Sequence, residues 1–295
     1  MKTKLVIAVT AVLIQSGLVQ SQTTTGASFL WKISGNGIQK PSYLYFTLAT
    51  CDETIKFPSE VNAVLKDVNT IAVETNFQDK SIKERIQTEA RAVNDSEKID
   101  AVLSSEHYAQ YLKKLRSGLP ESVITQLGAF KPFGIYSFLN QTASPCEEGV
   151  SREKIEVVLK AYAKKKRKNF KEVFSLDAWI EKNRKYNNEH WNTTIMYALN
   201  NQDQITRTLQ QYYEQYKTGK IDQLRQTIQS APYFQLTPVS KEIKKEYVEK
   251  LTAAFENEIK LNSTFFQLGV ENFLYDGYSI LETLGKKGYT VEQLK

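Results

Sequence analysis

Four acidic residues lie where turns follow predicted strands, and carboxylates gathered at one place can do chemistry. Glu74 ends one predicted strand, and Asp177 follows another. Glu271 and Asp276 lie within or just after the turn that opens at Gly269. If these carboxylates converge on one crevice, they favour a calcium- or magnesium-type oxygen site or a hydrolase with paired carboxylates. The alternative is that Glu271 and Asp276 face water near a helix N-terminus, where negative charge is favourable.

The C-terminal stretch must position much of this site. It reads as a strand over Thr264–Leu268, a turn from Gly269, a helix around Tyr278–Lys286 and a last strand over Gly288–Val291. The carboxyl ends of strands in an α/β sheet open onto a crevice. We therefore expect a crevice lined by Glu74, Asp177, Gly269, Glu271 and Asn272.

The N-terminal part of the chain is rich in strands. Phe29–Ser34 and Ser42–Leu48 flank Gly35-Asn36-Gly37, which is a strong hairpin signal. Thr70–Thr75 reads as a further buried strand that carries Glu74 at its end. Between this strand and the hairpin, a helix that opens at Pro58 has apolar residues at helical spacing.

The middle of the chain, from Ser81 to about Gln229, is mostly helical, with a strand predicted only over Asn169–Leu176. A long helix over Ser240–Leu261 leads into the C-terminal strands. The pattern predicts a mixed α/β fold in which the N- and C-terminal strands share one central sheet and a large helical section lies between them. We expect one domain over residues 29–295. The predicted helical segments of the middle are Ile82–Ala92, Glu106–Arg116, Val123–Leu127, Phe133–Leu139, Ser151–Lys165 and Ala178–Gln215.

Residues 1–21 resemble a cleaved secretory signal, and 22–28 form a polar leader. Lys2 and Lys4 precede the apolar run Leu5–Ile14, and small residues lie near Ser21. This predicts a secreted or periplasmic protein without a membrane span, since no later segment has the ~20 apolar residues that a span needs. Cleavage removes two lysines and leaves 37 basic and 33 acidic residues. The resulting net charge of +4 is too mild to indicate nucleic-acid binding.

The chain contains two cysteines and two histidines. In an oxidising compartment Cys51 and Cys146 are expected to form a disulfide, and the alternative is a pair of buried thiols. His107 and His190 are isolated, so we expect surface or hydrogen-bonded histidines rather than metal ligands. This set also lacks the ligand spacing of a zinc site.

Several segments, in this order along the chain, resemble the TraB/GumN family, which is related to the Tiki proteases. They are Leu30–Gly37 with Pro41–Tyr45, Val73-Glu74, Ala129–Phe133, Tyr216–Leu224 and Phe265–Tyr289. The resemblance implies an extracytoplasmic α/β domain and, in the Tiki branch, a metal-dependent peptidase. The implied metal site uses two Gly-x-x-His motifs and intervening acidic residues, because imidazoles and a carboxylate can hold a divalent ion that activates water.

The chain departs from this pattern at both histidines. The first motif ends at Ala49 and the second at Asn272, while Glu74 matches the family's strand-end carboxylate and Asp177 stands in for a later one. An alanine offers a metal no ligand, and an amide binds transition metals less well than imidazole does. We therefore expect an exported, catalytically degenerate protein that binds an unknown protein or peptide ligand and has no cofactor. The alternative is a Tiki-type metal-dependent peptidase or hydrolase that uses a divalent metal with Glu74, Asp177, Glu271 and Asn272.

Overall fold

The computed structural model describes residues 29–75, 79–147, 153–235, 238–275, 277 and 279–294. The expected signal segment (residues 1–21), the polar leader (residues 22–28) and Asp276 lie outside the described residues. Within those ranges no helix combines the length and the apolar character that crossing a membrane requires.

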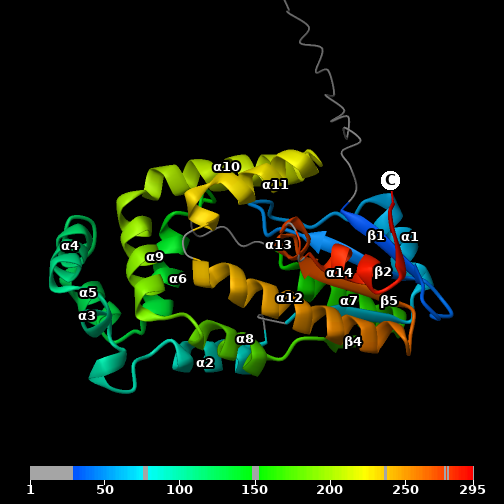
Figure 1. Ribbon diagram of the computed structural model, residues 1–295, viewed down its shortest axis with the longest axis horizontal. Helices are drawn as coiled ribbons and strands as arrows, with labels where there is room; N and C mark the ends of the chain where they lie inside the picture. The colour runs from blue at the N-terminus through cyan, green and yellow to red at the C-terminus, as the bar shows by residue number, and fades with distance from the viewer. Residues whose placement is uncertain are drawn as a thin grey trace, which may run out of the picture.

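One mixed six-stranded sheet in the order β4-β3-β5-β2-β1-β6 lies at one end of the molecule, and the helical middle of the chain extends away from it (Figure 1). Strands β4, β3, β5 and β2 are parallel neighbours, whereas β1 runs antiparallel to both β2 and β6. The prediction that the N- and C-terminal strands share one sheet is therefore confirmed, and so is the α/β class. The strands are β1 (Leu30–Gly35), β2 (Ser42–Thr47), β3 (Thr70–Val73), β4 (Asn169–Glu172), β5 (Thr264–Gly269) and β6 (Tyr289–Gln293).

The β1–β2 hairpin follows the predicted turn. Gly35, Asn36 and Gly37 have φ values of 79°, 47° and 79°. These values lie in the left-handed region that glycine and asparagine tolerate best. The Asn36 amide also donates to the carbonyl of Lys287 at 3.0 Å. The turn thus joins the hairpin to the residues that lead into β6.

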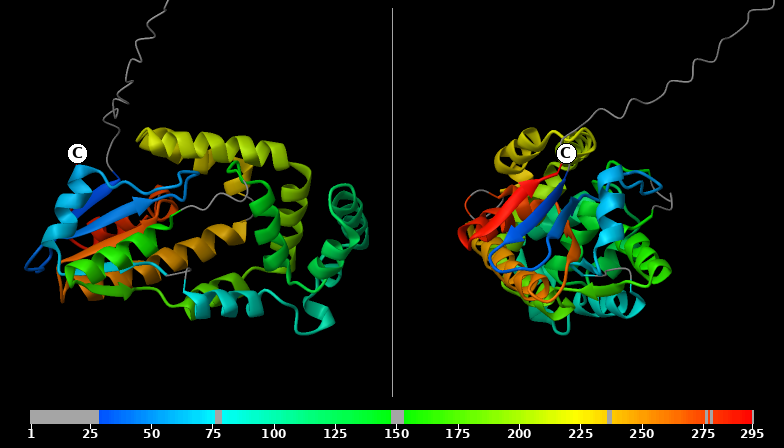
Figure 2. Two further views of the ribbon diagram at one scale, coloured as in Figure 1. Left: turned by 180° about the vertical axis from the view of Figure 1, so that it is seen from behind. Right: turned by 90° about the vertical axis from the view of Figure 1, so that its right-hand side faces the viewer.

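The central strand β5 is covered by helices on both faces. Its residues from Thr264 to Leu268 are all buried, as expected for a parallel strand with both faces covered. Phe266 packs edge-on against Phe255 of α12 (Pro238–Ile259), with ring centroids 4.4 Å apart. Its neighbour Phe265 contacts Tyr45 from the opposite face. Figure 2 shows α12 on one side of the sheet, and α1 (Ser59–Asp67) and α7 (Ile155–Lys166) on the other.

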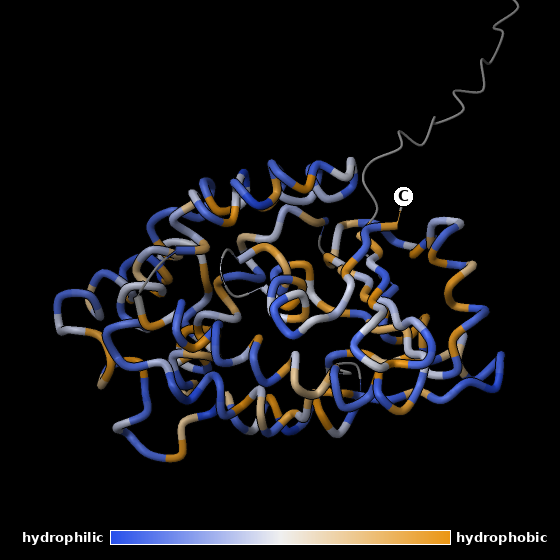
Figure 3. The backbone as a smooth tube through the Cα atoms, turned by 45° about the vertical axis from the view of Figure 1, so that its right-hand side comes forward, coloured by the Kyte–Doolittle hydropathy of each residue, from blue (hydrophilic) through white to orange (hydrophobic). Residues whose placement is uncertain are grey.

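A second hydrophobic cluster lies within the helical middle of the chain, apart from the cluster around the sheet. Apolar residues alternate with polar ones along these helices, which lets each helix bury one face (Figure 3). The helices not yet introduced are α2 (Lys80–Glu89), α3 (Ile99–Val102), α4 (Ser105–Arg116), α5 (Glu121–Leu127), α6 (Pro132–Thr142), α8 (Leu176–Arg184), α9 (Asn188–Asn200), α10 (Gln202–Lys217), α11 (Ile221–Ser230), α13 (Glu271–Leu274) and α14 (Ile280–Lys286), with short 3₁₀ turns at Asp95–Glu97 and Pro232–Phe234.

Two predictions about the helical middle are wrong in detail. The strand expected over Asn169–Leu176 ends at Glu172, because the Ser175 side chain accepts a hydrogen bond from the Ala178 N–H and caps α8. Asp177 consequently lies in the first turn of a helix rather than at a strand end. The single helix expected over Ala178–Gln215 is divided into α8, α9 and α10, and the Asn187 side chain caps α9.

The predicted disulfide is confirmed, since the sulfur atoms of Cys51 and Cys146 lie 2.07 Å apart. It joins the loop after β2 to the segment after α6, and the two cysteines are separated by 95 positions in the chain. The disulfide therefore links the loop at the end of a central strand to the helical middle.

Replacing both cysteines by serine should lower the free energy of unfolding by about 2–5 kcal/mol, because the unfolded chain regains the entropy of a long open loop. Urea unfolding of the oxidised wild type and of the Cys51→Ser/Cys146→Ser variant measures this loss. A reducing agent should destabilise the wild type and leave the variant unchanged. Equal stability of the two oxidised proteins would contradict the prediction.

Candidate functional site

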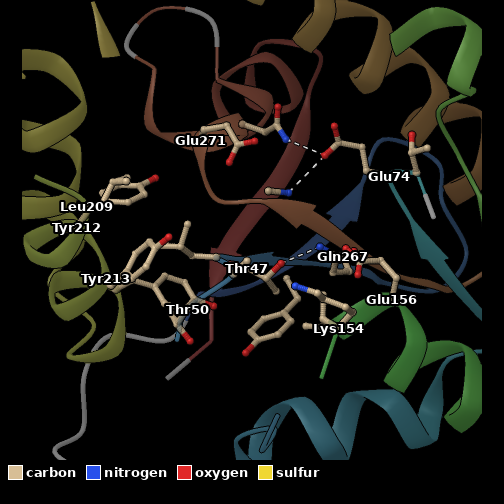
Figure 4. A pocket seen from close by; sticks show the side chains of 18 of the residues that line it. Thr47, Thr50, Glu74, Lys154, Glu156, Leu209, Tyr212, Tyr213, Gln267 and Glu271 are labelled. Carbon is tan, nitrogen blue, oxygen red and sulfur yellow. Dashed lines mark hydrogen bonds between the residues drawn. The ribbon is translucent and has the colours of Figure 1, made fainter. Parts of the chain in front are cut away.

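A cavity of about 770 Å³ opens at the carboxyl ends of the parallel strands β2, β5 and β3. The strand register places these ends together, because Thr47 pairs with Gly269 and Val73 pairs with Gln267. Figure 4 shows Glu74 and Glu271 on one side of this cavity and the tyrosines of α10 on another. The crevice predicted at the strand ends is therefore present.

Glu74 lies at the centre of a hydrogen-bond network at the strand ends. One carboxylate oxygen accepts a hydrogen bond from the Tyr247 hydroxyl of α12. The other accepts from the Asn272 side-chain amide at 3.1 Å and from the Gly269 backbone N–H at 3.4 Å (Figure 4). Both oxygens are thus engaged by donors of the protein itself.

Glu271 lies across Gly269 and faces the cavity. A Cβ atom at position 269 would overlap the Glu271 carboxylate, so a larger residue there would displace this side chain from its place. The cavity walls surround Glu271, although its side chain still meets solvent inside the cavity. This partial removal from bulk water raises the pKa of Glu271, the negative charge of Glu74 raises it further, and Lys182 and Lys244 oppose the shift.

Tyrosines and hydrogen-bonding side chains form the remaining walls. On the sheet side, the Gln267 amide donates to the Thr47 hydroxyl at 2.7 Å. On the α7 side, burial raises the pKa of the Glu156 carboxyl, which also lines the cavity. The aromatic residues of the lining are Tyr45, Trp179, Tyr186, Tyr212, Tyr213, Tyr216, Tyr233, Phe234, Tyr247 and Tyr275.

Two lysines that the sequence does not single out complete the site. Lys182 of α8 places its ammonium nitrogen 4.0 Å from the ring centre of Tyr247, and Lys244 of α12 lies 4.9 Å from that of Tyr275. Burial lowers the pKa of both lysines, that of Lys244 to about 8. Glu74 and Glu271 oppose the shift in the pKa of Lys182, and Glu271 opposes that of Lys244. Charged residues on amphipathic helices usually face solvent, so only the tertiary structure reveals this placement.

Of the predicted site residues, the structure brings together Glu74, Gly269, Glu271 and Asn272, all of which line the cavity. It does not bring Asp177 to them. That carboxylate is 70% exposed on α8, forms an ion pair with Arg85 and is not part of the lining.

The two histidines lie away from the lining of this cavity. The His107 ring nitrogen Nδ1 lies 2.8 Å from the side-chain oxygen of Asn192. His190 is buried and stacks on Tyr186, with ring centroids 4.0 Å apart, and burial lowers the pKa of His190 to about 4. It is therefore neutral at pH 7.

The sequence profile of the TraB/PrgY/gumN family matches residues 29–293, which is nearly the whole chain. The chain belongs to this family. No curated protein and no solved structure matches it.

Within this TraB/PrgY/gumN-family chain, both positions at which the family motifs predict histidine line the cavity, as Ala49 and Asn272. Ala49 provides no ligand atom, and the Asn272 amide nitrogen is directed at Glu74. No group of three or more His, Cys, Asp or Glu side chains in the described ranges is arranged to hold an ion. The residues at the strand ends therefore do not fit the divalent transition-metal site that the family motif implies.

Substitutions of Asn272 test the network around Glu74. Asn272→Ala should lower the free energy of unfolding by about 1–3 kcal/mol, because one donor to the carboxylate is lost. Asn272→Asp should cost more at pH 7, since it places a second carboxylate beside Glu74. Chemical denaturation of both variants measures the two losses. An Asn272→Ala variant as stable as the wild type would show that Glu74 does not depend on a donor at this position.

Proposed function

We propose that this TraB/PrgY/gumN-family chain is an exported binding protein whose cavity receives a peptide or a segment of a partner protein, and that it has lost the metal-dependent hydrolysis of the Tiki branch. The observation that carries this proposal is the hydrogen bonding of both carboxylate oxygens of Glu74. Tyr247, Gly269 and Asn272 donate to both of its oxygens, so a network of protein donors occupies the place where the family motif predicts a metal ligand.

The size and chemistry of the cavity support a binding role. A volume of about 770 Å³ lies within the range of ~300–1,000 Å³ that is usual for ligand sites. Its tyrosines combine large apolar faces with hydroxyl groups, a combination that is common where proteins bind other chains. The buried Gln267 and Thr47 and the half-buried loop residue Thr50 add polar groups with which a peptide backbone can form hydrogen bonds.

Export is supported by two observations. The Cys51–Cys146 pair is at disulfide distance, and disulfides persist in oxidising compartments. The N-terminal segment 1–21 has the composition of a cleaved signal. Both observations support the proposal that the protein is periplasmic or secreted.

The second candidate function is a hydrolase, and it is favoured by Glu74 and Glu271 facing the same cavity. Two nearby carboxylates with different environments can divide the roles of acid and base between them. This alternative and the binding role differ in their response to metal and in the fate of a bound peptide.

Thermal unfolding with EDTA and then with manganese, cobalt or zinc separates the two functions. We expect a flat response from the wild type and a rise of several degrees for the Ala49→His/Asn272→His variant, because metal binding stabilises the folded state. The single variants serve as matched controls. A metal-dependent rise in the wild type that Glu74→Ala abolishes would contradict the loss of the metal site.

Binding itself is tested by selection from a library of random peptides. Selected peptides should bind the wild type and remain intact, because no hydrolysis is expected. Ala49→Trp should abolish binding by filling the exposed rim of the cavity, whereas Ala101→Trp on the exposed surface of α3 should not. Failure to select any peptide that Ala49→Trp blocks, or cleavage of those selected, would refute the binding role.

A further inference from the structure

Lys182 and Lys244 are cations inside the cavity, and the described residues provide no close counter-ion for either. They enter from α8 and α12, and each ammonium lies over an aromatic ring. In the described part of the chain neither lysine has a carboxylate within the 4.0 Å of a salt bridge. Charged groups that are partly removed from water are normally paired with an opposite charge. Two lysines without such a pair indicate that a group from outside the chain completes the site.

Most acids of the cavity wall already have partners. Asp52 forms an ion pair with Lys217 at 2.8 Å, and the Glu153 carboxylate accepts a hydrogen bond from the Ile55 N–H at 2.7 Å. Glu74 accepts from its three donors. Burial raises the pKa of Glu156, which disfavours its negative charge.

The charges of Glu74 and Glu271 act on Lys182, and that of Glu271 also acts on Lys244. Neither carboxylate comes within salt-bridge distance of the two ammonium groups. The inner part of the cavity therefore presents ammonium hydrogens that have no close acceptor among the described residues, although the whole lining contains acids as well as bases.

We infer that Lys182 and Lys244 together bind an anionic group of the ligand, a carboxylate or a phosphate, within the cavity. This inference rests on the proposed function only in taking the cavity as a ligand site. The rings of Tyr247 and Tyr275 each cover one side of an ammonium group, which leaves ammonium hydrogens on the other side to donate to an anion. The rings of Tyr212, Tyr213 and Tyr233 line the same cavity and provide apolar faces for the body of the ligand, so the class is an organic anion with an apolar or aromatic body.

The experiment compares three probes that share one ring: benzoate, phenyl phosphate and the neutral benzamide. Isothermal titration calorimetry at pH 7 should show at least one anion binding tenfold or more tightly than benzamide. Lys182→Met and Lys244→Met should each remove most of this preference, and Lys244→Arg should retain it. Lys245→Met is the matched control, because Lys245 is the exposed neighbour of Lys244 on α12. Comparison of benzoate with phenyl phosphate distinguishes a carboxylate site from a phosphate site.

The pH dependence provides a second measurement. The groups that act on Lys244 are Glu271, Lys182, the ring of Tyr275 and His190, which is neutral at this pH. Because the pKa of Lys244 is about 8, anion affinity should fall as the pH rises from 7 to 9. Lys244→Met should show a weaker fall over the same range.

Three outcomes would overturn the inference. Equal affinity for benzamide and for both anions is the first, and an equal loss of anion binding in Lys245→Met is the second. The third is the absence of binding by every probe. None of these outcomes tests the peptide-binding proposal, which is tested separately by the library selection and the Ala49→Trp variant. Unchanged urea unfolding of the methionine variants would show that a loss of affinity does not come from a loss of folding.

Discussion

The hydrogen bonds to Glu74 hold the functional face of the molecule together. The carboxylate follows directly from β3 and receives donors from α12, from the last residue of β5 and from α13. Its backbone also takes part, since the Glu74 N–H donates to Gln267 and the Glu74 carbonyl accepts from Phe174. A buried carboxylate is stable only when its oxygens are satisfied, so these elements must be in place together.

This network also shows how a chain with the family fold can hold a strand-end carboxylate with its own donors. In a metal site, strand-end residues bind the ion, and its binding energy helps to fix their positions. In this chain the Tyr247 hydroxyl and the Asn272 amide donate to Glu74 and fix its position. Under the proposed function, Glu271 and the two lysines are charged groups of the cavity wall that can recognise a charged ligand.

Local patterns were enough to predict most of the fold. The Gly35-Asn36-Gly37 turn, the buried run of β5 and the strands at both ends of the chain correctly indicated one shared sheet. Cysteine number and compartment correctly indicated the disulfide. The prediction failed over Asn169–Leu176, because the apolar residues there suit a strand as well as a helix start and the capping role of Ser175 was not recognised.

The sequence predicted only those residues of the candidate site that come directly after a strand. Glu74, Glu271 and Asn272 come directly after parallel strands, so the topology places them together. Tyr247 lies 173 positions from Glu74 and belongs to an amphipathic helix, and such a contact leaves no local signal. The same holds for Lys182 and Lys244, whose helices also carry charged residues that face solvent.

The disulfide has a consequence for how the cavity can change during evolution. The loop after β2 forms one rim of the cavity, and its residues Ala49, Asp52, Thr54 and Lys56 are exposed. The covalent bond between Cys51 and Cys146 anchors this rim, so these side chains need not contribute to packing. Mutations there can therefore accumulate at little cost to stability, and related proteins can diversify their ligands at this rim while the sheet stays constant.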